Sequence, residues 1–334
     1  MISFSKIVKS LSLGFAIFLF VNIVSCSREE TRNEKSRLYT NLGTIGNEEV
    51  QKLFAQHLNT AKKCSPMGAK KRAIVTGFGP FGGGSLNISG VVIDNMANPA
   101  FWPASINTAD GNLPDMQQIE LRQGMNESAD YGGHVTMRQL TIDGIDYDVC
   151  LIVLDVLWDL AAAIIVDEAI RFEPNLILMT GQGEYDARFE KGSVNMAVRE
   201  NGFNADGSTA EHNRPISDYV LKTTPPGEEV MYMKWDNKKL SSATEPTIKD
   251  LGFNVVASNT PYSTGSYICN NVSYAVLRAL QDQKVELVEG LITLYPRLST
   301  ELKAGFFHFP YMDDFSKEQI YNWARVMAMT IHLL

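Results

Sequence analysis

Apolar residues recur along the chain in two spacings, from residue 71 to the C-terminus. Short β-branched runs predict strands, and apolar positions three and four residues apart predict helices. The predicted strands cover residues 71–76, 135–141, 146–153, 176–179 and 254–258. The predicted helices cover 87–96, 158–172 and 270–281, and a last one follows Ser316. Because strands alternate with helices, we expect a three-layer α/β/α sandwich around an open, twisted, mostly parallel sheet.

Local signals mark several element ends. Asp143-Gly144 lies between two strand-like runs and predicts a hairpin. Ser316 followed by Gln319 is the pattern of a capping box at a helix start. Residues 99–130 show no period and are rich in turn formers, so we interpret them as a long excursion from the sheet.

The N-terminal residues have the pattern of an export signal. Lys6 and Lys9 precede an apolar run over 11–24, and Ser25 precedes Cys26. This pattern predicts a lipoprotein signal peptide over 1–26, after which Cys26 becomes acylated. A plain anchor helix is the alternative, although the run is short for a membrane span. We therefore expect an exported bacterial lipoprotein, anchored to a membrane and facing the periplasm or the cell surface.

Three further segments follow the signal peptide. Residues 27–46 are polar and charged, which predicts a flexible tether. Asn47 can cap a helix within 47–66, and residues 67–334 then form one large domain. The formal charge of −8 argues against a nucleic-acid-binding surface.

The four cysteines are too few for a disulfide scaffold. Cys64 and Cys150 could pair in an oxidising compartment. However, Cys150 lies in an apolar strand-like run, which favours a buried, inert thiol.

Cys269 and His308 are the candidate reactive pair. Cys269 stands where a loop passes into a helix, and the amides of the helix's first turn favour a thiolate there. His308 lies among aromatic residues and could serve as its base. Each alone has a plain structural explanation, as a small packing residue or a core histidine. The pairing gains weight from the motifs around it.

Three motifs carry a family resemblance. They are Thr-Gly-Phe-Gly-Pro-Phe-Gly-Gly at 76–83 with Asn87, Gly-Ser-Tyr-Ile-Cys-Asn at 265–270, and Gly-Phe-Phe-His-Phe-Pro-Tyr at 305–311. Their order and spacing resemble pyroglutamyl peptidase I, also called pyrrolidone carboxyl peptidase. This family of cysteine peptidases removes an N-terminal pyroglutamate from peptides. The resemblance covers most of residues 72–334 in scattered blocks and implies the same fold.

The resemblance implies a catalytic set. Cys269 would be the nucleophile and His308 the general base and acid. The family's catalytic acid follows a Gly-Gln pair, and here Glu190 in Glu-Lys-Gly-Ser-Val-Asn matches it if two residues are missing. Glu190 would orient the His308 ring. Glu184 is an alternative acid, but it lacks the Val-Asn context.

The resemblance also implies how substrate is bound. Phe78 and Phe81 would wall a flat, uncharged lactam, and Gln182 would hydrogen-bond it. The alternative is that both phenylalanines fill the core. The implied partners are a peptide with an N-terminal pyroglutamate and, through Cys26, a membrane. No nucleic acid, metal or organic cofactor is implied, and a homo-oligomer stays open.

Some residues depart from the family pattern. Glu184-Tyr185-Asp186 replaces a basic, glycine-rich turn, and Asn271 replaces a histidine. Extra length occurs between Asn87 and Val135, between Glu200 and Leu251, and between Gln283 and Lys303. Two other functions therefore stay open: a catalytically inactive binding lipoprotein on the same fold, and a cysteine hydrolase for a different acyl group.

Overall fold

The computed structural model describes twelve parts of the chain. They are residues 46–59, 62–80, 86–109, 121–122, 133–157, 160–195, 221–223, 230–265, 267–281, 285–287, 292–294 and 301–334. The predicted signal peptide with Cys26, residues 27–45 of the predicted tether and Phe81 lie outside the described residues. Gly46, the last residue of the predicted tether, begins the first described helix. Within these parts, no helix combines the length and the apolar character that crossing a membrane requires.

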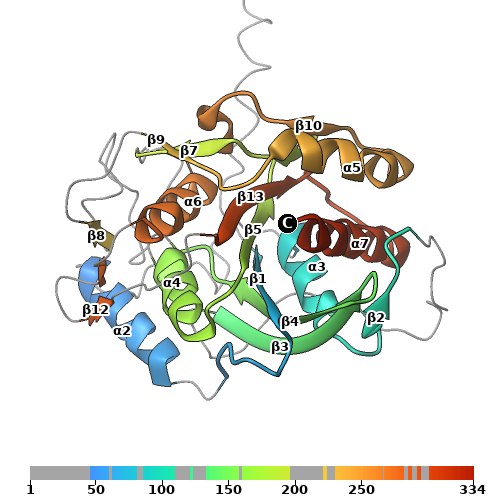
Figure 1. The fold of residues 1–334 in the computed structure, drawn as a ribbon. Helices are drawn as coiled ribbons and strands as arrows, with labels where there is room; N and C mark the ends of the chain where they lie inside the picture. The colour runs from blue at the N-terminus through green and yellow to red at the C-terminus, as the bar shows by residue number, and fades with distance from the viewer. Residues whose placement is uncertain are drawn as a thin grey trace, which may run out of the picture.

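An eight-stranded sheet forms the middle of the molecule (Figure 1), in the order β10-β6-β13-β5-β1-β4-β3-β2. The strands are β1 Lys71–Phe78, β2 Ser105–Ile106, β3 Gly133–Ile142, β4 Ile145–Leu154, β5 Leu176–Gln182, β6 Ala187–Phe189, β10 Val255–Ala257 and β13 Lys303–Phe309. Neighbours are parallel except for the pairs β3 with β4 and β6 with β13. The prediction of an open, mostly parallel sheet is confirmed.

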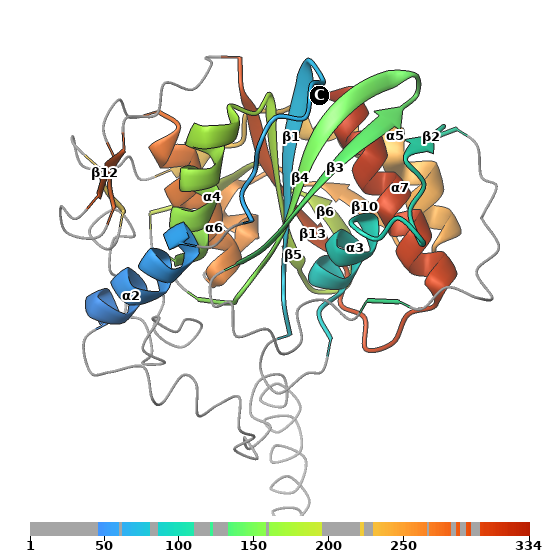
Figure 2. The same ribbon diagram turned by 90° about the horizontal axis from the view of Figure 1, so that it is seen from below.

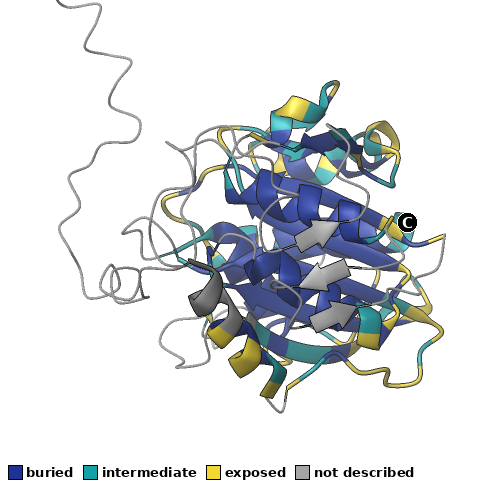
Figure 3. Cartoon of the chain, turned by 90° about the vertical axis from the view of Figure 1, so that its left-hand side faces the viewer, coloured by how far each residue is buried: buried dark blue, intermediate teal, exposed yellow. Residues whose placement is uncertain are grey.

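Helices cover both faces of this sheet, as Figure 2 shows along its edge. One face carries α2 Gly46–Asn59, α4 Leu160–Phe172 and α6 Ile268–Ala279, and the other carries α3 Ile88–Met96, α5 Asn237–Asp250 and α7 Lys317–Leu333. Successive side chains of a strand enter opposite cores: Ile74 packs on the α4 side, and Val75 on the α3 side. Buried residues accordingly fill the sheet and its inner helix faces (Figure 3). The three-layer prediction is confirmed.

Smaller elements flank the main sheet. β7 Gly192–Val194 pairs with β9 Val230–Tyr232, and β8 Leu221–Thr223, β11 Val285–Leu287 and β12 Ile292–Leu294 form a three-stranded sheet. A short 3-10 helix, η3 Pro261–Thr264, precedes α6. These small elements lie in or near the segments that are longer here than in the family that the sequence resembles.

Two local sequence signals match the observed element ends, whereas α2 begins at Gly46, before the predicted cap Asn47. The hairpin at Asp143-Gly144 joins β3 and β4, and Ser316 and Gln319 form the expected capping box of α7. The helix predicted over 270–281 begins at Ile268, so Cys269 lies inside its first turn. The sequence analysis did not predict α5, which contains Pro246 and buries only Leu240, Thr244 and Ile248.

The expected buried thiol at Cys150 is wrong, because Cys150 forms a disulfide with Cys64. The chain before β1 crosses β4 at this point. The backbone N–H groups of Met67 and Gly68 donate to the Asp148 carboxylate, two residues before Cys150. This anchoring brings the two Cα atoms to 5.5 Å, within the usual range for a disulfide.

Candidate active site

Parallel strands bring the predicted site residues to one edge of the sheet. Phe78 and Gln182 are the last residues of β1 and β5, and His308 is the last but one of β13. β13 pairs with β5 so that His308 lies beside Gly181. Ligand sites in open α/β sheets lie beyond the carboxyl ends of the strands. The fold therefore places these residues where such sites occur.

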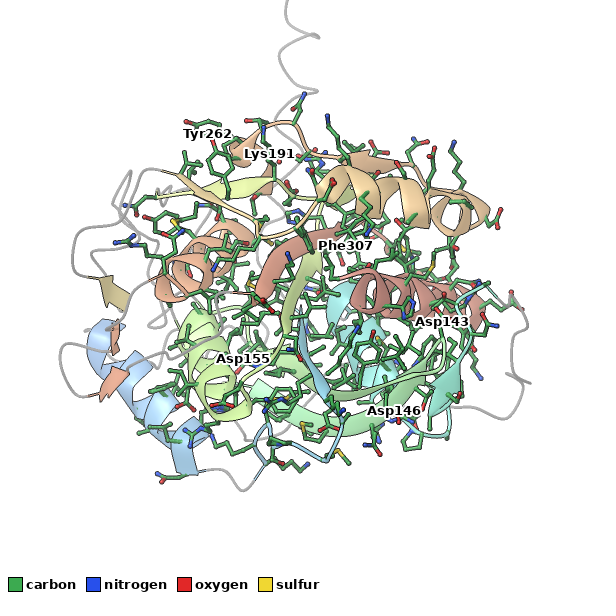
Figure 4. The ribbon with its side chains drawn as sticks, viewed as in Figure 1. Asp143, Asp146, Asp155, Lys191, Tyr262 and Phe307 are labelled. Atoms are coloured by element: carbon green, nitrogen blue, oxygen red, sulfur yellow. A yellow bond between two sulfur atoms is a disulfide. The ribbon has the colours of Figure 1, made fainter. Side chains whose placement is uncertain are left out.

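His308 faces the same side of the sheet as α6. Alternation along β13 sends Phe306 into the core below α4 and α6, and sends Phe307 and Phe309 into the opposite core. The Phe306 and His308 rings are 4.8 Å apart. Figure 4 labels Phe307, the residue between them. The histidine thus continues the α6 face of β13 and is only 7% exposed.

Cys269 reaches the site from the first turn of α6. As at any α-helix start, the first-turn N–H groups have no acceptor within the helix itself, and the side chain of Tyr267, the residue before the helix, does not cap them. Cys269 is buried and carries a free thiol. The positive end of the helix therefore lies at the sulfur and favours the thiolate.

Gly181 makes room for this sulfur. A Cβ atom at Gly181 would lie 2.9 Å from Cys269 Sγ and 2.9 Å from Phe306 Cζ. Carbon and sulfur atoms do not approach so closely without displacement. The glycine in β5 therefore allows Cys269 to lie directly against the strand beside His308.

Glu190 is the acid partner of His308. Its Oε1 lies 2.8 Å from His308 Nδ1, and its side chain is fully buried. Burial by itself lowers the pKa of His308, but the charges and hydrogen bonds of Cys269 and Glu190 outweigh it and raise this pKa from 6.5 to about 10. His308 is then an imidazolium between two groups that stabilise its charge. Glu184, the alternative acid, is exposed.

Glu190 comes into position through β6, which runs antiparallel to β13. Its backbone N–H donates to Phe306 O at 3.0 Å, and its carbonyl accepts from Trp235 Nε1 at 2.8 Å. The Trp235 ring covers Gly305, where a Cβ would lie 2.3 Å from the indole. The sequence analysis missed Trp235 and also Ser263, whose hydroxyl donates to Glu190 Oε2.

The two predicted substrate residues within the described part differ in setting. Phe78 is buried in the same core as Cys269. This position agrees with the alternative in the sequence analysis, in which Phe78 fills the core. Gln182 Oε1 accepts from Ile88 N at the start of α3, at 3.2 Å. Because a backbone N–H can only donate, the atom that it contacts must be the Gln182 amide oxygen. The NH2 group of Gln182 then remains to donate hydrogen bonds to another acceptor. The role of this NH2 group toward a substrate stays a prediction, as does that of Phe81.

Within the described residues, one group of side chains has metal-ligating chemistry: His57, Asp167 and Glu168, all buried between α2 and α4. Glu168 already lies 2.9 Å from His57 Nε2 and 3.5 Å from Lys63 Nζ. Asp167 is paired with Arg171. Lys63 and Arg171 place positive charge beside the two carboxylates, so we interpret the cluster as the contact that holds α2 on α4.

The chain has detectable relatives. No protein-family model matches it. A pyrrolidone-carboxylate peptidase from Enterobacter sp. (strain 638) is 21% identical over 244 residues, which are 73% of this chain and 80% of that protein. This chain is thus similar to that pyrrolidone-carboxylate peptidase over most of the length of both proteins.

Solved structures with similar folds carry related names. A pyroglutamyl peptidase I from Bacillus amyloliquefaciens is 17% identical, with a TM-score of 0.49 over 79% of this chain and 98% of that one. A pyrrolidone carboxyl peptidase from Thermococcus litoralis is 18% identical, with a TM-score of 0.46 over 79% of this chain and 93% of that one.

Proposed function

We propose that this protein is a cysteine peptidase that removes an N-terminal pyroglutamate from peptides. The observation that carries the proposal is the spatial arrangement of the Cys269, His308 and Glu190 side chains. A thiol at a helix start, an imidazolium that interacts with it, and a buried carboxylate 2.8 Å from the imidazole Nδ1 are the parts that a cysteine nucleophile requires. The relationship to a pyrrolidone-carboxylate peptidase supports the substrate class.

The chemistry follows from these positions. The Cys269 thiolate attacks the carbonyl carbon of the pyroglutamyl group, and first-turn amides of α6 stabilise the resulting oxyanion. The C–N bond breaks as the His308 imidazolium gives its proton to the leaving amine, which leaves a thioester on Cys269. Water then attacks the thioester and loses a proton to His308, which releases pyroglutamate. Glu190 stays ionised throughout and holds the ring.

Substrate selection rests on the lactam. Gln182 has its Oε1 occupied by Ile88 N, so its amide hydrogens can donate to the lactam carbonyl. Phe78 and Phe81 would line the ring. Prolyl substrates have a similar ring without that carbonyl, and the enzyme should disfavour them because a site donor would stay unpaired.

The same proposal includes export and lipid attachment at Cys26. The disulfide between Cys64 and Cys150 supports an oxidising compartment, where such bonds persist. Mass spectrometry of the native protein should find a mature chain that starts with acylated Cys26. An intact Met1 would exclude this part of the proposal.

The central test is release of a fluorescent amine from pyroglutamyl and prolyl amides by the purified full-length protein. Cys269→Ser and His308→Ala should each lower kcat by about 10³-fold or more, because they act as a unit. Glu190→Gln should lower kcat strongly, whereas the matched change Glu184→Gln, at the exposed alternative acid, should not. Gln182→Leu should erode the preference for pyroglutamyl over prolyl amides.

Two outcomes would point elsewhere. Equal kcat/KM for both amides would favour a hydrolase for a different acyl group. Tight binding of a pyroglutamyl peptide without turnover would favour a binding lipoprotein on this fold.

A further inference from the structure

The second oxygen of the Glu190 carboxylate has its own donor. Oε1 holds His308, and Oε2 accepts a hydrogen bond from Ser263 Oγ. Ser263 belongs to η3, a segment far from Glu190 in sequence. In Figure 4, Tyr262 and Lys191, the neighbours of Ser263 and Glu190, lie close together, and Lys191 Nζ donates to Asn259 O at 3.1 Å. The loop that contains Ser263 is thus tied to the strand end that carries Glu190.

The direction of the hydrogen bonds can be deduced from the available protons. Ser263 has one hydroxyl proton and three acceptors in reach: Glu190 Oε2, Thr260 O at 3.0 Å and the Ser258 hydroxyl oxygen. A buried carboxylate is the stronger acceptor. Thr260 O already receives the Ser258 hydroxyl at 2.7 Å. Ser263 therefore donates to Glu190, and Ser258 keeps the neighbouring carbonyl satisfied.

The loop itself is held in place on both sides of Ser263. Thr260 caps η3 by accepting from Tyr262 N, and Thr264 Oγ1 donates to Gly192 O in β7. Ser258 Oγ also contacts Ser263 Oγ. The hydroxyl of Ser263 is accordingly presented by a fixed turn, which limits the entropy lost when it bonds the carboxylate.

With Ser263 included, each polar atom of Glu190 has a partner. Phe306 O binds its N–H, Trp235 Nε1 binds its carbonyl, and His308 and Ser263 bind its two carboxylate oxygens. The backbone contacts place the residue, and the two side-chain hydrogen bonds fix the rotation of the carboxylate. A buried carboxylate that lost one of them would be free to turn away from His308.

We propose that Ser263 is a positioning residue for the reaction: it fixes the rotation of Glu190 and thereby keeps the imidazole of His308 aligned with Cys269. This inference rests on the proposed function. In the sequence, η3 with Ser263 comes shortly before α6, so the residue that orients the acid is close along the chain to the nucleophile.

The experiment compares Ser263→Ala and Ser263→Thr with Thr264→Val, all in the full-length protein. Thr264→Val removes the next hydroxyl of the same turn, which bonds Gly192 and not Glu190. Ser263→Ala should lower kcat about tenfold, equivalent to about 1.4 kcal/mol and close to the value of one hydrogen bond to a charged group, with KM nearly unchanged. Ser263→Thr should restore kcat. Thr264→Val should lower Tm at least as much as Ser263→Ala but leave kcat near the wild-type value.

A second readout needs no substrate. Iodoacetamide alkylation of Cys269, followed by peptide mass spectrometry at pH 6.5, reports how much of the thiol is held as an ion pair with His308. Ser263→Ala should slow it, and Ser263→Thr and Thr264→Val should not. Wild-type kcat and alkylation in Ser263→Ala would overturn the inference, as would an equal loss of kcat in Thr264→Val. If the wild-type protein hydrolysed no pyroglutamyl amide but alkylation still depended on Ser263, the proposed function would fail and the role of Ser263 would stand.

Discussion

At the scale of single residues, the most telling value is the pKa of His308, raised to about 10. Burial opposes the charge, so Cys269 and Glu190 must supply more stabilisation than burial removes. The raised pKa of His308 therefore depends on three residues together, and it should fall when either Cys269 or Glu190 is changed.

This leads to a prediction about pH. A raised pKa in the folded state stabilises the protein fully below the unfolded value of 6.5, and the contribution is lost as pH rises toward about 10. The His308 ring signals in NMR should therefore titrate near pH 10 in the wild type. In Glu190→Gln and in Cys269→Ser the midpoint should move toward 6.5. The unfolding free energy of the wild type, relative to His308→Gln, should fall between pH 6.5 and 10. A wild-type midpoint near 6.5 would contradict the ion pair.

Sequence reasoning reached Cys269, His308 and Glu190 through short motifs, because each lies in a local run with its own pattern. It did not reach Ser263 or Trp235. Ser263 meets Glu190 across 73 positions of sequence, and its own segment carries no signal beyond a capped turn. A hydroxyl acquires such a role only from the partner that the fold brings to it. Tertiary contacts of this kind leave no periodic trace in the chain.

At the scale of elements, caps and apolar stripes were sufficient for most of the sheet and its helices. Among the strands of the main sheet, the short β2 and β6 were not predicted. Among the described helices the exception is α5, whose interior contains Pro246 and whose buried residues are few. The sequence does contain two indications of this helix: the N-cap residue Asp236, and the residues Leu240, Thr244 and Ile248, which follow it at a spacing of four. A proline inside a helix normally argues against the helix, so tertiary packing on α7 and β10 prevails here over local propensity.

The approach of β5 to α6 gives a second prediction. Gly181→Ala places a methyl group 2.9 Å from the present position of Cys269 Sγ, so the thiol or the strand must shift. A displacement of the order of 1 Å near reacting groups can lower kcat by about 10²-fold. We expect that loss, together with slower alkylation of Cys269, while circular dichroism remains that of the wild type. Unchanged turnover in Gly181→Ala would mean that the thiol does not need its place against β5.

At the scale of the whole molecule, the segment before β1 is attached to the domain by three kinds of contact. The disulfide Cys64–Cys150 links it to β4, His57 pairs with the buried Glu168 on α4, and Asp148 accepts backbone N–H groups from the residues after Cys64. The sequence analysis favoured a buried thiol because the residues that surround Cys150 in its strand are apolar. Pairing depended on where the upstream chain crosses β4, which no local pattern encodes.

The last prediction concerns this attachment. The disulfide spans a sequence separation of 86, and closing a loop of that size should stabilise the fold by about 4 kcal/mol through the unfolded chain. The double variant Cys64→Ala/Cys150→Ala should therefore unfold at a clearly lower denaturant concentration than the wild type. The disulfide joins the segment after α2 to β4 and includes none of Cys269, His308 and Glu190, so kcat of the folded double variant should match the wild type. Dithiothreitol should destabilise the wild type but have no further effect on the variant. If the variant and the wild type unfolded together, the bond would add nothing to the fold, and the paired carboxylates Glu168 and Asp148 would be sufficient to hold the N-terminal segment in place.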